Sequence, residues 1–136
     1  MQKFILACCF LLLSQSCWTQ TVKIIHQVFE VDTISEISLD LHGEYELQAW
    51  AGNTVMSETR IKIYDAPQHV VNHFIDEKGR YAIDATSAEA KLLLTSKDKE
   101  RVEIKYKGIH CYEEVGLRLY VPDSFEIIDQ QTLRKK

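Results

Sequence analysis

Apolar and polar residues alternate with period two along several parts of this chain. The alternation is clearest in four stretches: residues 37–41, 60–63, 101–107 and 117–121. Successive side chains of a strand point to opposite faces, so this pattern predicts strands with one face on a core and the other in water. In the third stretch the core face would carry Val102, Ile104 and Tyr106.

Two further stretches are apolar but less regular. Residues 22–31 are rich in β-branched side chains, and residues 92–94 are three consecutive leucines, which predicts a strand buried on both faces. Turn signals separate these runs: His42-Gly43, Gly52-Asn53, Lys78-Gly79, Lys107-Gly108 and Pro122-Asp123. Short strands with closely spaced turns favour a single mainly β domain, either a sandwich, a barrel or a solenoid, over a β-α-β fold.

One segment, residues 66–77, has a helical period instead. Four apolar side chains would share one face of a helix: Val70, Val71, Phe74 and Ile75. Asp65 is the predicted N-cap, Pro67 falls in the first turn, and Gly79 can supply the left-handed stop. We expect one short helix here, packed on the strands by its apolar face.

The order of strands and turns resembles the exported adhesin-like β-strand proteins of Bacteroidetes, a family of uncharacterised function. The resemblance lies in "ISLDLHGEYELQAWAGNTVMSETRIKIY", "GRYAIDA", "VEIKYKG" and "GLRLYVPDSFEI", which together cover most of the chain after residue 19. It implies a β-solenoid-like stack. This chain departs from the family in its short length and in the helix at 66–77. A solenoid needs about three stacked repeats, and no clean repeat is present, so a sandwich stays open as the alternative.

The first nineteen residues have the pattern of a secretory signal. Lys3 precedes an unbroken apolar run over residues 4–13, followed by the polar stretch 14–16. The run is shorter than the roughly 18 apolar residues that a membrane span requires. We predict cleavage after Thr19, which leaves residues 20–136 as a single β-rich domain. The alternative is cleavage before Cys17, which would leave a lipid-anchored protein. Both routes export the domain to the periplasm, the cell surface or the medium.

The net charge narrows the class of binding partner, and the cysteine content excludes a disulfide within the processed chain. The predicted signal contains one of the 16 basic residues and none of the 20 acidic ones, so the exported domain is acidic. An acidic domain is a poor partner for nucleic acid, whose phosphates require clustered Lys and Arg. Cys111 is the only cysteine after residue 19, so no disulfide can form within one processed chain. We expect this thiol to be buried and inert, and the alternatives are a disulfide between chains or a reactive thiol.

Two histidines are the candidate metal ligands. His69 and His73 lie four residues apart on the predicted helix, a spacing that can bind a metal ion. The zinc-protease pattern needs a Glu directly after the first His, and Val70 stands there. The neighbours His110 and Cys111 would point to opposite faces of a strand and form no dyad. The prediction is therefore that no metal or other cofactor is bound.

Trp50 and Tyr45 are the candidate ligand-binding residues. Trp50 lies beside the Gly52-Asn53 turn, where an exposed indole can stack on a sugar, or alternatively close one end of the core. The five glycines are dispersed, so there is no Gly-rich phosphate loop, and no Gly-x-Ser-x-Gly elbow is present. Acidic pairs such as Glu113-Glu114 are interpreted as solvated. The pattern favours a non-catalytic, adhesin-like binding module for an envelope protein. The alternatives are a carbohydrate-binding module for a surface glycan and a metal-dependent enzyme.

Overall fold

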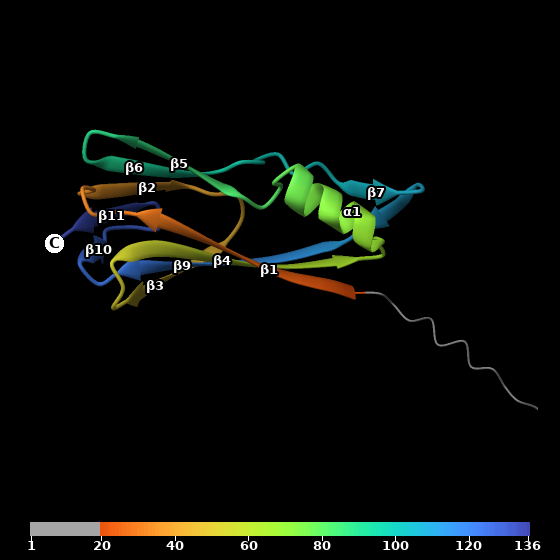
Figure 1. Ribbon diagram of the computed structural model, residues 1–136, viewed down its shortest axis with the longest axis horizontal. Coiled ribbons are helices and arrows are strands. Elements are labelled where there is room, and N and C mark those ends of the chain that lie inside the picture. Colours follow the sequence, from red (N-terminus) through yellow and green to blue (C-terminus); the bar gives the residue numbers. More distant parts are fainter. Residues whose placement is uncertain (1–19) are drawn as a thin grey trace, which may run out of the picture.

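Eleven strands and one short helical segment make up the computed structural model, which describes residues 20–136. Figure 1 shows two layers of strands, one above the other, with the helix and a small hairpin at one end. The predicted signal peptide and both candidate cleavage sites lie outside the described residues. The prediction of a mainly β fold with one short helix near residues 66–77 is confirmed.

The first sheet has four strands in the order β1-β4-β9-β3. Their bounds are Gln20–Glu30 for β1, Thr54–Tyr64 for β4, Glu113–Pro122 for β9 and Tyr45–Trp50 for β3. β4 is antiparallel to both neighbours, whereas β3 is parallel to β9. The register of β1 on β4 is continuous over all eleven residues of β1, so this edge strand has no bulge.

The second sheet has five shorter strands in the order β10-β11-β2-β6-β5. Their bounds are Phe125–Ile127 for β10, Thr132–Lys135 for β11, Glu36–Asp40 for β2, Lys91–Ser96 for β6 and Ile83–Ala88 for β5. β2 and β6 are parallel, and the other pairs are antiparallel. A separate hairpin is formed by β7 (Ile104–Tyr106) and β8 (Ile109–Cys111).

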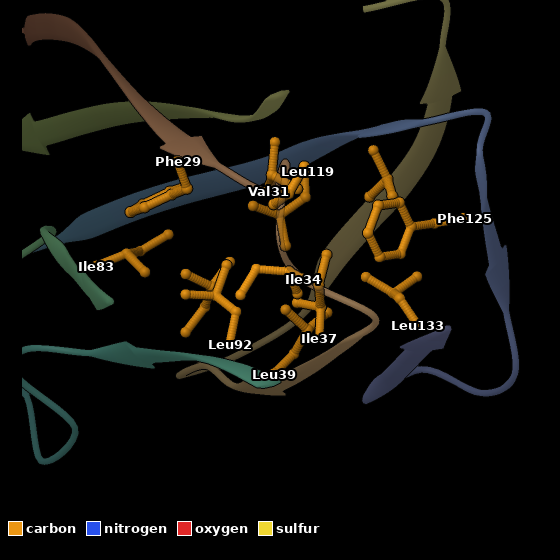
Figure 2. Close-up of a cluster of buried hydrophobic side chains, with 13 residues drawn as sticks. Phe29, Val31, Ile34, Ile37, Leu39, Ile83, Leu92, Leu119, Phe125 and Leu133 are labelled. Atoms are coloured by element: carbon orange, nitrogen blue, oxygen red, sulfur yellow. The ribbon is translucent and has the colours of Figure 1, made fainter. Parts of the chain in front are cut away.

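The main core lies between the two sheets (Figure 2). We call it the sandwich core. Its buried side chains come from both sheets and from the turn after β1: Phe29, Val31, Ile34, Ile37, Leu39, Val55, Ile83, Leu92, Leu94, Leu119, Val121, Phe125 and Leu133. Two sheets that bury their apolar faces against each other form a sandwich. The sandwich is therefore the alternative that the structure shows, rather than a solenoid-like stack.

A second core lies under the helix, and we call it the helix core. α1 (Gln68–Asn72) continues directly into a π-helical turn, η1 (His73–Glu77). Val71 and Ile75 are buried there, and Val70 and Phe74 are partly buried against the same cluster, so the predicted apolar face is confirmed. Gly79 follows the helix at a φ of 59°, the left-handed stop that the sequence predicts. Within residues 20–136, no helix is long and apolar enough to cross a membrane.

The predicted N-cap is wrong. The N-cap position is Pro67, and no side chain caps the first turn. Asp65 instead adopts a φ of 62° and turns the chain out of β4. Ala66, which follows it, is buried in the helix core. The chain thus uses Asp65 to reverse direction, which leaves its carboxylate two residues too early to cap the helix.

Two strand predictions also need correction. The leucine run 92–94 is buried on one face only, because Leu92 and Leu94 enter the sandwich core while Leu93 is 40% exposed. The predicted strand 101–107 is reduced to Ile104–Tyr106, and Val102 is 73% exposed. β6 belongs to the second sheet of the sandwich and β7 to the separate hairpin, and each has an apolar face that is buried on one side only.

Candidate functional site

A cavity of about 290 Å³ is lined by residues of both sheets, at the junction of the two cores. β4 explains its position. The inward side chains of this strand are Val55 in the sandwich core, then the polar pair Ser57 and Thr59, then Ile61 and Ile63 in the helix core. Thr59 lines the cavity. Its lining residues are His42, Gly43, Glu44, Thr59, Tyr81, Ile83, Ser96, Arg101, Glu113, Val115 and Leu117.

A buried ion pair closes one side of this cavity. Arg80 is only 3% exposed and holds Glu113 through two hydrogen bonds, from Nε to Oε2 at 3.1 Å and from Nη2 to Oε1 at 2.6 Å. The hydroxyl of Tyr81 also donates to Glu113 Oε2. Burial alone would lower the pKa of Arg80, but the hydrogen bonds with Glu113 more than offset it, and the net shift is upward. Glu113 is thus a structural acid, and interpreting it as merely solvated was wrong.

The side chain of Tyr81 is 2% exposed. It belongs to the helix core and also lines the cavity. Burial, followed by the hydrogen bond to Glu113, raises the pKa of this phenol far above its usual value. Tyr81 therefore stays protonated and serves as a fixed donor and as an aromatic wall. The guanidinium carbon of Arg101 lies 5.1 Å from the centre of its ring, which is a cation–π contact.

Arg101 differs from Arg80 in having unused donors. Its Nε is buried and makes no hydrogen bond, and no acidic side chain of the described residues lies within 4.0 Å of its guanidinium. The backbone of Arg101 has a φ of 42°, a left-handed conformation that costs a non-glycine residue about 1–2 kcal/mol. Its backbone N–H donates to Asp98 Oδ1 at 2.9 Å. Burial lowers the pKa of Arg101.

The second notable surface is the free edge of β1. Within residues 20–136, β1 pairs with β4 only, so about half of its backbone N–H and C=O groups have no strand beside them. Three apolar side chains on its outer face are exposed: Val22 at 49%, Ile24 at 43% and Val28 at 58%. A long edge strand with an apolar face is a template for pairing with another chain.

The other edges of the two sheets are better protected. β10 has only three residues, β5 and β3 have six each, and β1 has eleven. β3 carries Glu46 on its outer face, where it pairs with Arg118 at 3.0 Å. Short edge strands and charged side chains are the usual ways in which proteins prevent edge pairing. An inward-pointing charge can also protect an edge strand, and β1 carries Lys23 on its inner face. The Nζ of Lys23, however, forms an ion pair with Asp76 of the helical segment at 2.8 Å.

The structure separates the two candidate ligand-binding aromatics. Tyr45 and Trp50 stand five positions apart on β3, so they point to opposite faces of the first sheet. Tyr45 packs against the sandwich core, and its hydroxyl donates to the carbonyl of Gln130. The indole of Trp50 donates to the carbonyl of Thr54 at 2.9 Å and folds over Gly52. The two rings therefore form no common sugar platform.

The two candidate metal-binding histidines have separate partners. His73 Nδ1 lies 2.8 Å from Glu77 Oε2, one helical turn further on. The ring of His69 packs edge-on against Tyr106 at 5.6 Å. In the part of the chain that the structure describes, no group of three or more His, Cys, Asp or Glu side chains is arranged to hold a metal ion.

The prediction for Cys111 is confirmed, because its side chain is 1% exposed in the helix core. Its thiol contacts the backbone carbonyl of Asp65 at 3.5 Å, and burial raises its pKa. His110, the preceding residue, points instead toward Glu103, with Nδ1 3.5 Å from Oε2.

Sequence reasoning missed Arg80, Tyr81 and Arg101 as members of one cluster. They lie on the segment after the helix and on the loop before β7, and they meet Glu113 at the start of β9. None of these positions carries a motif or a spacing that marks it. The only available signal was an Arg-Tyr pair directly after a predicted helix stop, which is too common to single out. No protein-family model, curated protein or solved structure matches this chain.

Proposed function

We propose that this protein is an exported, non-catalytic binding module of adhesin-like type that accepts an extended strand of a partner protein along the free edge of β1. The observation that carries the proposal is the eleven-residue edge, which is regular, free of bulges, and lined on its outer face by exposed Val22, Ile24 and Val28. Strand addition uses main-chain hydrogen bonds for affinity and alternate side-chain contacts for specificity.

The outer face around β1 supports a protein partner. Val28 stands opposite Met56 on β4, which in turn stands opposite Tyr120 on β9, so an apolar row extends inward from the edge. His26, on the same face of β1, lies 3.2 Å from Glu58. A partner strand beside β1 could therefore continue both an apolar row and a polar row. Export rests on the predicted signal at residues 1–19, and the resemblance to exported adhesin-like proteins agrees with it.

The test is site-specific cross-linking in the cells that produce the protein. A photoreactive phenylalanine analogue at Val28 should form a discrete cross-linked product with an envelope protein. The same analogue at Leu93 is the matched control, because Leu93 is an exposed apolar residue of β6, an inner strand of the other sheet. The intact mass of the recovered product should also correspond to a chain that begins at Gln20.

Strand addition predicts new backbone hydrogen bonds on β1 as well as contact between the two proteins. In the purified cross-linked complex, the backbone amides of β1 that point away from β4 should become protected from hydrogen exchange. Ile24→Lys should remove both the product and this protection, because a charge on an apolar edge opposes pairing. Equal cross-linking from Val28 and Leu93, or no change in amide protection, would contradict the proposal. A product that contains only two copies of this chain would replace the adhesin-like role with self-association.

A further inference from the structure

The edge strands β1 and β5 belong to different sheets, and one side chain joins them. The side-chain oxygen of Gln27 accepts from the backbone N–H of Ile83 at 2.8 Å, and its nitrogen donates to the carbonyl of the same residue at 3.1 Å. The two edges therefore lie on the same side of the molecule, and this amide fixes the distance between them.

A groove of about 550 Å³ lies between these edges, next to Gln27. Its floor is apolar, because three residues of the sandwich core line it: Phe29, Ile34 and Leu92. The space is within the range of sites that hold a ligand, and it is large enough for a long apolar side chain. The groove thus leads from the surface to the sandwich core.

The wall that β5 contributes shows that this side of the sandwich is open. Ala85 and Ser87 line the groove and stand opposite Leu94 and Leu92, which are buried on the inner face of β6. Facing residues of paired strands point to the same face, so Ala85 and Ser87 also point inward. Both are nevertheless exposed. Their small side chains leave the floor of the groove uncovered.

A strand added to β1 would reach this groove. Gln27 and Phe29 are on the inner face of β1, and the residue of an added strand that stands opposite Phe29 would point to the same face. Its side chain would enter the groove between the two edges and cover the apolar floor. A polar side chain there would lose water without gaining a partner.

The charge of the groove narrows the partner further. Among the described residues that line it, Glu30 and Asp32 are acids, and none is Lys, Arg or His. Both acids are exposed. Within residues 20–136, neither forms an ion pair. A basic side chain at this end of the groove would meet complementary charge.

We propose that the protein strand that joins β1 inserts a large apolar side chain into this groove and carries a neighbouring Lys or Arg that pairs with Glu30 and Asp32. This inference rests on the proposed function and names the kind of segment that the β1 edge selects. Main-chain bonds along β1 would hold any extended segment, whereas the groove distinguishes segments by their side chains.

The first test is thiol protection in the complex that is cross-linked through the photoreactive analogue at Val28. Ser87→Cys introduces a thiol into the groove, and Thr86→Cys, the matched control, introduces one on the outer face of the same strand. In the free protein both thiols should react with N-ethylmaleimide. In the complex the thiol at position 87 should react about tenfold more slowly, and the thiol at position 86 should react as before.

Groove-filling and charge variants test selection. Ala85→Phe should lower the yield of the Val28 product about tenfold, because it occupies the space of the partner's side chain. Thr86→Phe should leave the yield unchanged. The double variant Glu30→Gln, Asp32→Asn should lower the yield about threefold. Glu126→Gln is its control, since Glu126 is an exposed acid of β10 at the opposite edge of the second sheet.

The outcomes separate this inference from the proposed function. A Val28 product in which the thiol at position 87 stays reactive would show strand addition without insertion, and would overturn this inference alone. Mass-spectrometric sequencing of the partner segment gives a reading that needs no variant. A segment without a large apolar residue beside a Lys or Arg would also overturn the inference. No Val28 product at all would overturn both proposals.

Discussion

A buried arginine inside a β-sandwich requires an acid beside it, and Glu113 meets that requirement for Arg80 through two hydrogen bonds. Such pairs contribute little net stability compared with apolar residues, but removal of one partner is expensive because it leaves an uncompensated buried charge. Tyr81 adds a third interaction to the same carboxylate. At the scale of residues, this cluster fixes the start of β9 against the segment that follows the helix.

Tyr81 should make the stability of the protein depend on alkaline pH. Its folded pKa is raised above the ordinary tyrosine value of 10.0, first by burial and then by Glu113. Above about pH 10 the phenol ionises in the unfolded state but not in the folded state. Ionisation then stabilises the unfolded state, so the free energy of unfolding falls. Tyr81→Phe has no phenol hydroxyl to ionise, so its stability lacks this pH dependence. Urea unfolding from about pH 8 to about pH 11 should therefore show the advantage of the unmodified protein over Tyr81→Phe shrinking as pH rises. A constant difference across that range would contradict the assignment.

At the scale of elements, the connection between β3 and β4 shows how a side chain can be tied to the turn that follows it. The Trp50 ring lies on the backbone of Gly52, and its N–H is bound to Thr54. The indole also contacts the ring of Tyr120 with their centres 6.1 Å apart. These contacts hold Trp50 as part of the turn rather than as a free surface for a sugar.

Gly52→Ala should expose this dependence. A Cβ at Gly52 would stand 2.4 Å from a ring atom of Trp50, so the indole must leave its position. We expect a loss of about 1–3 kcal/mol in the free energy of unfolding, the usual cost of overpacking. Gly116→Ala is the matched control, because a Cβ there meets nothing within 4 Å, and it should stay within about 0.5 kcal/mol. Equal effects in urea denaturation would mean that Trp50 is mobile.

At the scale of the whole molecule, the sandwich core and the helix core share β4 and β9, which run through both (Figure 1). The polar residues Ser57 and Thr59 mark the boundary between the cores, and the cavity lies at that boundary. The second sheet covers only one half of the long strands, and the helix with the β7–β8 hairpin covers the other.

The leucine run of β6 tests this arrangement directly. Leu94 is fully buried in the sandwich core, whereas Leu93 is 40% exposed on the outer face of the same strand. Leu94→Ala should cost about 2–5 kcal/mol of unfolding free energy in urea, because it removes apolar contacts and leaves a cavity. Leu93→Ala should cost well under about 1 kcal/mol. Similar losses for both would mean that the outer face of the second sheet is covered.

The hydrophobic pattern by itself determined three of the four clearly alternating stretches as strands, and it determined the apolar face of the helix. These follow from local geometry, since the side-chain period of a strand or a helix assigns residues to a face before the neighbours are known. The tertiary structure decided the exposure of Leu93 and Val102, because it depends on which layer lies above each residue. It also decided that Asp65 forms a turn at the end of β4 instead of capping the helix.

The two candidate sites belong entirely to the tertiary structure. β1 reads like any other strand in the sequence, and it becomes an edge only because the strand order is β1-β4-β9-β3. Arg101 reads like a solvated loop residue, but in the structure its guanidinium lies 5.1 Å from the centre of the Tyr81 ring and its Nε is buried without a hydrogen-bond partner. Local periodicity encodes which face of an element is apolar. Only long-range packing decides which edge stays unpaired and which buried donor stays without a hydrogen-bond partner.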